Sequence, residues 1–348
     1  MIITRTPFRI SFFGGGTDYP VWYRDHGGAV LGAAIDKYCY ISCRYLPPFF
    51  AHHSRAIYSK IENVARNEDF EHPAVRACLT HLGVADGVEI HHDADLPART
   101  GLGTSSSFTV GLLHALHALR GELRDRSELA AEAIHVEQVL LRENVGAQDQ
   151  AFAAHGGFNL IRFAPDGAVS VQPVVTAAER LEQLQRHFML FFTGFTRIAS
   201  EIASQQIANT PKRQEELAAM QELVDAAARA LSDGARPVAE FGALLDQTWQ
   251  LKRRLADNIS NAGLDAIYDT ARRAGALGGK LLGAGGGGFM LLFVPPECQA
   301  AVRQALDSLL LVPFRFSAAG SELIHYERRA PFAADLARDR RRVYAHHA

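Results

Sequence analysis

The 348-residue chain has an apolar fraction of 48% and a net charge of -2, which suits about two domains with full hydrophobic cores. Charges of both signs are spread along it, which argues against a nucleic-acid or membrane partner and favours a small-molecule ligand. Its four cysteines form no CxxC pair and no zinc spacing, so we expect reduced thiols. The N-terminus lacks a cleavable-signal pattern and no apolar run approaches the roughly 20 residues that span a bilayer, so we expect a cytoplasmic protein.

Strand-like and helix-like patterns alternate in the first half of the chain. Apolar runs bounded by turn residues predict strands at 2–13, 29–35, 38–46, 88–91, 158–163 and 169–174. Helical spacing of apolar residues predicts one helix after residue 103 and a second over 127–142. A polar segment at 179–186 is expected to lead into the next domain.

The second half is dominated by helical patterns, near 196–208, 212–232, 236–256 and 263–275. Strands are expected at 188–193, 289–294, near 314 and at 322–326, with a helix over 296–310. This is an α+β pattern. The predicted division is a first domain at 1–180, a second at 181–335 and a basic tail at 336–348.

A glycine- and hydroxyl-rich segment, Leu96-Pro-Ala-Arg-Thr-Gly-Leu-Gly-Thr-Ser-Ser-Ser107, opens the first of these helices. Glycines let main-chain amides approach an anion, and a helix start adds free N–H groups and the positive end of its dipole. An ordinary helix cap after a tight turn is the alternative. The residues expected to hold nucleotide phosphates are Pro97, Gly101, Leu102, Gly103, Thr104, Ser105, Ser106 and Ser107.

Several better-known catalytic motifs are absent. The chain has no GxxxxGK[ST] segment, no complete dinucleotide-binding fingerprint and no HRD or DFG signature. It also lacks HExxH and GxSxG. These absences exclude the commonest phosphate-loop, protein-kinase, zinc-protease and serine-hydrolase patterns.

Two acids follow the glycine-rich segment. Glu137 falls within the apolar arc of the helix 127–142, where a carboxylate is costly unless a metal ion or a basic group meets it. A buried structural ion pair is the alternative. Asp149 lies in the short polar loop 144–150 and is a plausible proton acceptor, although turn and cap residues of this kind are common.

A third cluster, Lys280-Leu-Leu-Gly-Ala-Gly-Gly-Gly-Gly-Phe289, precedes a buried strand. Four consecutive glycines sacrifice backbone entropy, which indicates a tight turn approached by a ligand or by another loop. A plain packing turn is the alternative.

Taken in order, these segments resemble the galactokinase, homoserine kinase, mevalonate kinase and phosphomevalonate kinase (GHMP) superfamily. The run 6–9 followed by Gly14-Gly-Gly-Thr-Asp18 matches its first motif, 97–107 its phosphate loop and 280–289 its third motif. The resemblance covers nearly the whole chain. It is closest to the D-glycero-D-manno-heptose 7-phosphate kinases, through PFRISFFGGGTDYP, NVGAQDQ and GAGGGGFMLLF.

The resemblance implies an N-terminal α/β domain with a left-handed βαβ crossover, a C-terminal ferredoxin-like domain, and ATP and Mg²⁺ as cofactors. It assigns catalysis to Asp149, as acceptor of the substrate proton, and to Arg9, which offsets charge in the transition state. Ser105 and Glu137 are the expected magnesium ligands. The expected substrate-binding residues are Gly15, Gly16, Thr17, Asp18, Asp149, Arg197, Lys252, Lys280, Gly285 and Gly286.

The function implied is phosphorylation of the anomeric hydroxyl of D-glycero-D-manno-heptose 7-phosphate to the 1,7-bisphosphate, in nucleotide-activated heptose biosynthesis for capsule or lipopolysaccharide. Galactokinases usually carry Glu-His where Gly15-Gly16 stand here, and this difference disfavours galactose and leaves more room at the sugar. An L-fucose or mannose 1-kinase and a non-catalytic ATP and sugar sensor remain alternatives. The expected partner is a sugar phosphate, and homo-oligomerisation stays open.

Overall fold

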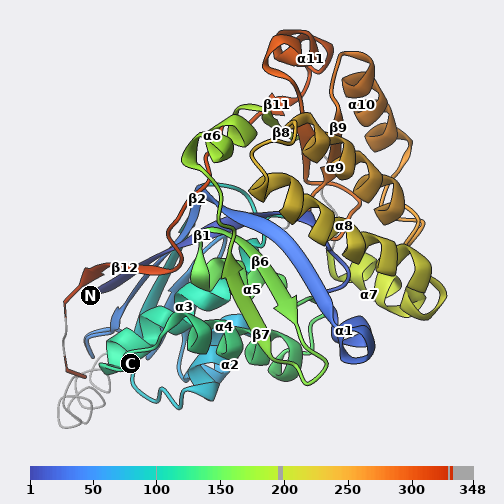
Figure 1. Cartoon of the computed structure of the whole chain (residues 1–348). Helices are drawn as coiled ribbons and strands as arrows, with labels where there is room; N and C mark the ends of the chain where they lie inside the picture. Colours follow the sequence, from blue (N-terminus) through green and yellow to red (C-terminus); the bar gives the residue numbers. More distant parts are fainter. Residues whose placement is uncertain (99, 195–198, 328–329, 332–348) are drawn as a thin grey trace.

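The computed structural model describes residues 1–98, 100–194, 199–327 and 330–331, and these form an α+β protein built on two sheets (Figure 1). Among the described residues, no helix is long and apolar enough to cross a membrane.

The larger sheet has eight strands and carries the N-terminal half of the chain. Its main order is β12-β1-β2-β5-β3-β4, and β6 pairs with both β2 and β7. The strands are β1 (Ile2–Phe13), β2 (Gly28–Tyr45), β3 (Ser54–Ile57), β4 (Ile61–Val64), β5 (Val88–Ala94), β6 (Phe158–Phe163), β7 (Val169–Pro173) and β12 (Glu322–Tyr326). Because β12 pairs antiparallel with β1, the chain returns to the first sheet near its C-terminal end.

Helices cover one face of this sheet, and α3 and α5 pack directly against β1 and β2 (Figure 1). Gly103 and Gly121, both in the left-handed region, bound α3. Asp125 and Glu128 form a capping box that starts α4. The helical elements of this half are α1 (Pro20–His26), η1 (Asn67–Asp69), α2 (Pro73–His81), α3 (Thr104–Arg120), α4 (Arg126–His135), the π-helix η2 (Val136–Leu140), α5 (Gln148–His155) and α6 (Ala178–Arg186).

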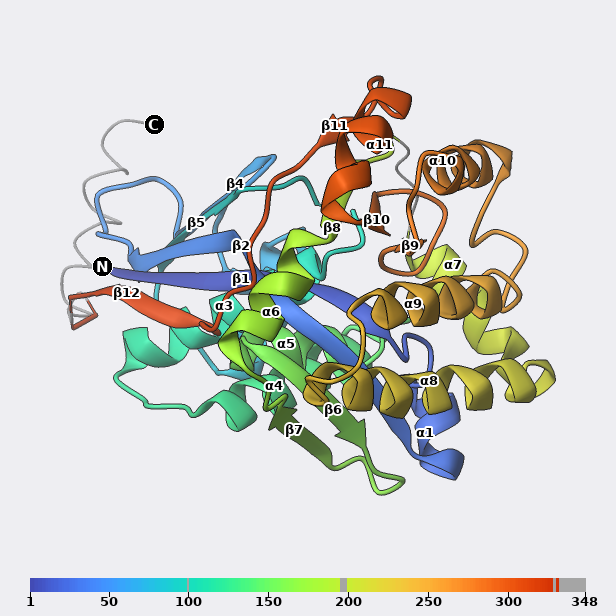
Figure 2. The same ribbon diagram turned by 45° about the horizontal axis from the view of Figure 1, so that its top comes forward.

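The smaller sheet has four antiparallel strands in the order β11-β8-β10-β9. Numbered along the chain this is 4-1-3-2, the arrangement of a ferredoxin-like domain, with α7–α10 in the first connection and α11 in the third (Figure 2). Its strands are β8 (Phe188–Phe192), β9 (Gly278–Leu281), β10 (Phe289–Phe293) and β11 (Leu310–Leu311). Its helical elements are α7 (Ala199–Asn209), η3 (Thr210–Lys212), α8 (Gln214–Ser232), α9 (Ala239–Lys252), α10 (Ala262–Arg273), η4 (Pro296–Cys298) and α11 (Gln299–Ala305).

Aromatic side chains join the two halves into one packed unit. The Phe12 ring of β1 stacks on Phe158 of β6 and on Phe188 of β8, with ring centroids 5.3 Å and 5.2 Å apart. All three rings are buried, so the two sheets share a hydrophobic cluster. The α+β class is confirmed, while the exact domain boundaries and the handedness of the crossover stay predictions.

Several elements differ from the sequence expectation. The strands expected at 29–35 and 38–46 form the single strand β2, and the polar region before β5 contains β3, β4 and α2. The helix expected over 127–142 changes at Val136 from α to π geometry. The strand expected near 314 is replaced by β11 and an isolated bridge between Phe316 and Ile35.

Candidate active site

A buried arginine and a partly exposed aspartate form the centre of the site. Asp149 lies in the first turn of α5, and Arg9 comes from the middle of β1. Arg9 donates two hydrogen bonds to Asp149, from Nε to Oδ1 at 2.8 Å and from NH2 to Oδ2 at 2.6 Å. The Arg9 side chain is 5% exposed and that of Asp149 is 24% exposed, so the carboxylate is held from one side and open on the other.

The same arginine holds the glycine-rich loop. Its third nitrogen, NH1, donates to the Gly101 carbonyl at 2.7 Å, and its main-chain N–H donates to the Leu102 carbonyl at 3.0 Å. Gly101 and Gly103 both have positive φ, at 84° and 75°. Among the described residues no side chain caps the start of this 17-residue helix, so its first turn can meet an anion.

The third glycine cluster packs directly against this loop. A Cβ at Gly283 would lie 2.4 Å from Gly101 Cα, and one at Gly288 would lie 2.3 Å from the Thr100 carbonyl oxygen. Gly285 has φ +132° and packs against Ile259, whose carbonyl accepts from the Gly286 N–H at 2.9 Å. The glycines of this cluster therefore let the turn at 283–288 approach the phosphate loop closely.

The turn Gly14–Asp18 forms the other wall of the site. Asp18 is buried, and its Oδ1 accepts from the Gly16 N–H at 2.9 Å. Burial raises the pKa of Asp18, and the neighbouring Asp149 carboxylate adds to that rise. The Thr17 hydroxyl oxygen lies 2.8 Å from both the Gly14 and the Ala29 carbonyl oxygens, and its single proton is shared between these two acceptors. The hydroxyl therefore shapes the turn, and substrate binding by Thr17 stays a prediction.

Glu137 lies in the π-helix and is 1% exposed. Its Oε2 accepts from the Ser106 hydroxyl at 2.8 Å and from the Gln150 amide, while its Oε1 is buried without a hydrogen-bond partner among the described residues. Burial raises the pKa of Glu137 to about 7. No basic group among the described residues is bonded to Glu137, which disfavours the buried ion pair, and its role as a magnesium ligand stays a prediction.

The lysines predicted to anchor a sugar phosphate are both buried. Lys252 is 4% exposed and donates to the carbonyls of Leu281, at 3.1 Å, and Gly283. Lys280 is 2% exposed and donates to the carbonyls of Ser11, at 2.8 Å, and Phe12, at 3.0 Å. Burial lowers the pKa of Lys252 to about 7 and lowers that of Lys280 strongly.

Both ammonium groups are thus bonded to main-chain carbonyls in the described structure, and the anchoring of a sugar phosphate by either lysine stays a prediction. Lys280 connects β9 to β1 at the place where the register of β1 against β2 shifts between Ser11 and Phe13. A β-bulge leaves carbonyls unpaired, and the buried ammonium satisfies them. Arg197, the third predicted anchor, lies outside the described residues.

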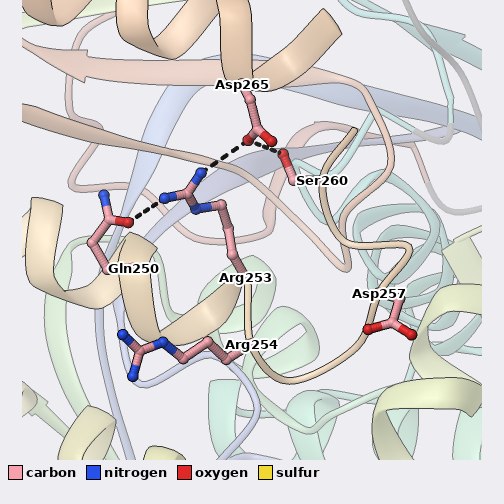
Figure 3. Close-up of a pocket in the computed structure, with 6 residues that line it drawn as sticks. All are labelled: Gln250, Arg253, Arg254, Asp257, Ser260 and Asp265. Carbon is pink, nitrogen blue, oxygen red and sulfur yellow. Dashed lines mark hydrogen bonds and ion pairs between the residues drawn. The ribbon is translucent and has the colours of Figure 1, made fainter. Parts of the chain in front are cut away.

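A pocket of about 420 Å³ lies on the turn between α9 and α10 (Figure 3). Arg253 donates to Asp265 at 3.0 Å and to Gln250, whereas Arg254 is exposed and forms no ion pair with any described residue. The same turn touches the site, because Leu255 Cδ1 would lie 3.5 Å from a Cβ at Gly16. The lining residues are Gln250, Arg253, Arg254, Asp257, Ser260 and Asp265.

Two polar residues around Glu137 differ from the sequence expectation. Gln150 was missed, and Ser106, predicted only as a phosphate contact, bonds to Glu137. Ser105 is exposed at the start of α3, and its hydroxyl has no hydrogen bond to a described residue. Glu137 and Gln150 lie on different helices, the π-helix and α5, so helical spacing in the sequence could not show that they are in contact.

Two family descriptions match the chain. "GHMP kinases N terminal domain" matches residues 69–157, and "GHMP kinases C terminal" matches residues 215–310. Together with the two-sheet fold and the glycine-lined site, these matches define a small-molecule kinase.

Known proteins are similar over nearly the full length. The chain is 30% identical over 319 residues to D-glycero-alpha-D-manno-heptose 7-phosphate kinase of Campylobacter jejuni, covering 88% of this chain and 93% of that protein. It is 25% identical to the bifunctional fucokinase/GDP-fucose pyrophosphorylase of Arabidopsis thaliana, covering 86% of this chain but only 30% of that protein. The crystal structure of a D-glycero-D-manno-heptose 1-phosphate kinase from Bacteroides thetaiotaomicron has a TM-score of 0.77 at 23% identity, covering 93% of this chain and 99% of that one.

The chain belongs to the GHMP kinase family. It is therefore an enzyme that transfers phosphate from ATP to an alcohol group.

Proposed function

We propose that the protein phosphorylates the anomeric hydroxyl of D-glycero-D-manno-heptose 7-phosphate. The observation that carries the catalytic part is the Asp149 carboxylate, held at both oxygens by Arg9 at 2.8 and 2.6 Å and still 24% exposed. The heptose acceptor is supported by the 30% identity to the Campylobacter jejuni heptose 7-phosphate kinase.

The proposed chemistry depends on alignment rather than on a covalent intermediate. The uncapped start of α3 and the glycines at 101 and 103 hold the phosphates of ATP. Asp149 orients the acceptor hydroxyl and accepts its proton, while Arg9 ties that carboxylate to the phosphate loop through the Gly101 carbonyl. Asp18 accepts hydrogen bonds from sugar hydroxyls.

Mg²⁺ fits the environment of Glu137. Its buried Oε1 has no partner among the described residues, and Ser106 bonds to its other oxygen. No cluster of three or more metal-binding side chains occurs in the described part of the chain, which suits an ion that takes its remaining ligands from phosphate and water. Glu137 and the exposed Ser105 would hold it, and the ion would neutralise phosphate charge.

Arg254 is our candidate for the distal phosphate of the acceptor, because it is exposed, forms no ion pair with a described residue and adjoins Leu255 at the Gly16 turn. Arg254→Ala should raise the Michaelis constant for heptose 7-phosphate about tenfold or more and leave that of an unphosphorylated sugar unchanged. Equal effects on both sugars would remove Arg254 from this role.

A direct test is ATP consumption with heptose 7-phosphate, mannose, L-fucose and galactose, followed by product analysis. We expect the highest kcat/KM with heptose 7-phosphate and a 1,7-bisphosphate product. Faster turnover of fucose or mannose would replace the heptose assignment with the alternative sugar 1-kinase, and turnover of none would favour a sensor.

A further inference from the structure

The three consecutive glycines of the substrate turn do not serve the same purpose. Gly14 has φ +82°, and a Cβ there would lie 1.9 Å from the Ala29 carbonyl oxygen. Gly16 has φ +110°, and a Cβ there would lie 2.5 Å from Gln206 Nε2. The backbone and its neighbours therefore require glycine at both positions.

Gly15 is different, because neither its backbone nor its neighbours require glycine. It is not among the glycines with positive φ, and the nearest atoms to a Cβ at this position lie 3.8 Å away. An alanine would fit the free protein without strain. The absence of a side chain at Gly15 thus leaves space beside the turn, and the room expected from both Gly15 and Gly16 is present only at Gly15.

Two polar side chains border this space. The Ser11 hydroxyl and the Gln148 amide nitrogen are the atoms that lie 3.8 Å from a Cβ at Gly15. Ser11 is 5% exposed and Gln148 is 8% exposed. Among the described residues, neither Ser11 Oγ nor Gln148 Oε1 has a hydrogen-bond partner. Buried polar atoms are normally paired, so the unpaired Ser11 Oγ at this space, together with the unpaired Oε1 of the Gln148 amide whose nitrogen borders it, points to a ligand-binding site.

The elements that carry these side chains also carry the catalytic pair. Ser11 follows Arg9 by two residues on β1, and Gln148 directly precedes Asp149 at the start of α5. Alternation along β1 puts Arg9 and Ser11 on the same face of the strand. The Gln148 side chain hydrogen-bonds to Asp18, and this bond lowers the pKa of Asp18, although burial raises it more. Since only the amide nitrogen can donate this bond, Gln148 Oε1 is left as an unused acceptor among the described residues.

We propose that Ser11 and Gln148 are specificity-determining residues that bind hydroxyl groups of the acceptor in the space beside Gly15. This inference rests on the proposed sugar kinase function. Gln148 Oε1 accepts a hydrogen bond and Ser11 Oγ can donate or accept, so the pair suits neighbouring hydroxyls of a polyhydroxylated acceptor.

The test compares Ser11→Ala and Gly15→Ala with Ser54→Ala as a matched control. Ser54 is also buried, but its hydroxyl donates to Asn67 at 2.6 Å and accepts from the Val88 N–H at 2.9 Å, away from the site. Ser11→Ala should lower kcat/KM for heptose 7-phosphate about three- to tenfold, and Gly15→Ala about tenfold. Neither should change the Michaelis constant for ATP or lower the melting temperature. Ser54→Ala should show the opposite pattern, with normal kinetics and a lower melting temperature.

Unchanged acceptor constants in both Ser11→Ala and Gly15→Ala would overturn the inference while leaving the proposed function intact. If the parent enzyme instead phosphorylates mannose, L-fucose or galactose, the heptose assignment fails, and the same three variants assayed with that sugar decide the role of Ser11. For any combination of variant and sugar that gives no turnover, sugar binding is measured by calorimetry in the presence of a non-hydrolysable ATP analogue. Binding of none of the four sugars would overturn both proposals.

Discussion

Glu137→Gln removes a buried charge while keeping the size of the side chain, and its effect on stability can be worked out from the structure. Burial raises the pKa of Glu137 from its ordinary 4.5 to about 7 in the folded protein. The folded state therefore binds this proton more tightly than the unfolded chain. Ionisation of Glu137 therefore destabilises the folded parent protein. This destabilisation is absent below pH 4.5, grows as the pH rises toward 7, and reaches about 3 kcal/mol above pH 7.

Urea unfolding at pH 5 and pH 8.5 without Mg²⁺ measures this effect. The variant should exceed the parent's free energy of unfolding by no more than about 1 kcal/mol at pH 5 and by about 3 kcal/mol at pH 8.5. Glu297→Gln, at an exposed position outside the site, is the control and should show no such change. With Mg²⁺ and ATP, Glu137→Gln should lose about a hundredfold or more in kcat. A variant that is no more stable than the parent at pH 8.5 would refute the account of an uncompensated carboxylate.

Two further substitutions test the ion pair and a buried histidine. Arg9→Lys keeps the charge but loses the bidentate contact with Asp149, so kcat measured by ADP release should fall about 10- to 100-fold. ATP binding measured by calorimetry should stay normal. An unchanged kcat would show that Arg9 is not needed to orient the Asp149 carboxylate. His117 is buried, and although burial opposes its charge, hydrogen bonds with Glu132 and Glu122 raise its pKa. The stabilisation by charged His117 is complete below pH 6.5 and is lost as the pH rises through the pKa of the folded protein. His117→Gln should therefore lower the free energy of unfolding in urea by about 1–3 kcal/mol at pH 6 and by less at pH 9. An equal loss at both pH values would contradict a stabilising charge on His117.

Local patterns predicted the elements whose signals are strong in the sequence. The bounds of β1, β6 and β12 agree with the predicted strands. The segment before β5 was not predicted because β3 and β4 have only four residues each. Runs of that length are difficult to distinguish from loops, and their pairing partners are distant in the chain.

The site shows the same division. The apolar arc around Glu137 indicated that its carboxylate is buried, and the structure agrees. The positions of Lys252 and Lys280 could not be deduced, because their carbonyl partners lie 29 to 269 residues away along the chain. Likewise, the sequence shows three equal glycines at 14–16, and only backbone geometry distinguishes Gly15 from its neighbours.

The most direct test of the proposed catalytic site is single-turnover phosphate transfer by Asp149→Asn. Melting temperature and ATP affinity must first match those of the parent, since the substitution leaves the phosphate loop in place. We predict that the rate of transfer to the sugar then falls at least about a hundredfold. A folded, ATP-binding Asp149→Asn enzyme that transfers phosphate at the parental rate would contradict the role given to this carboxylate.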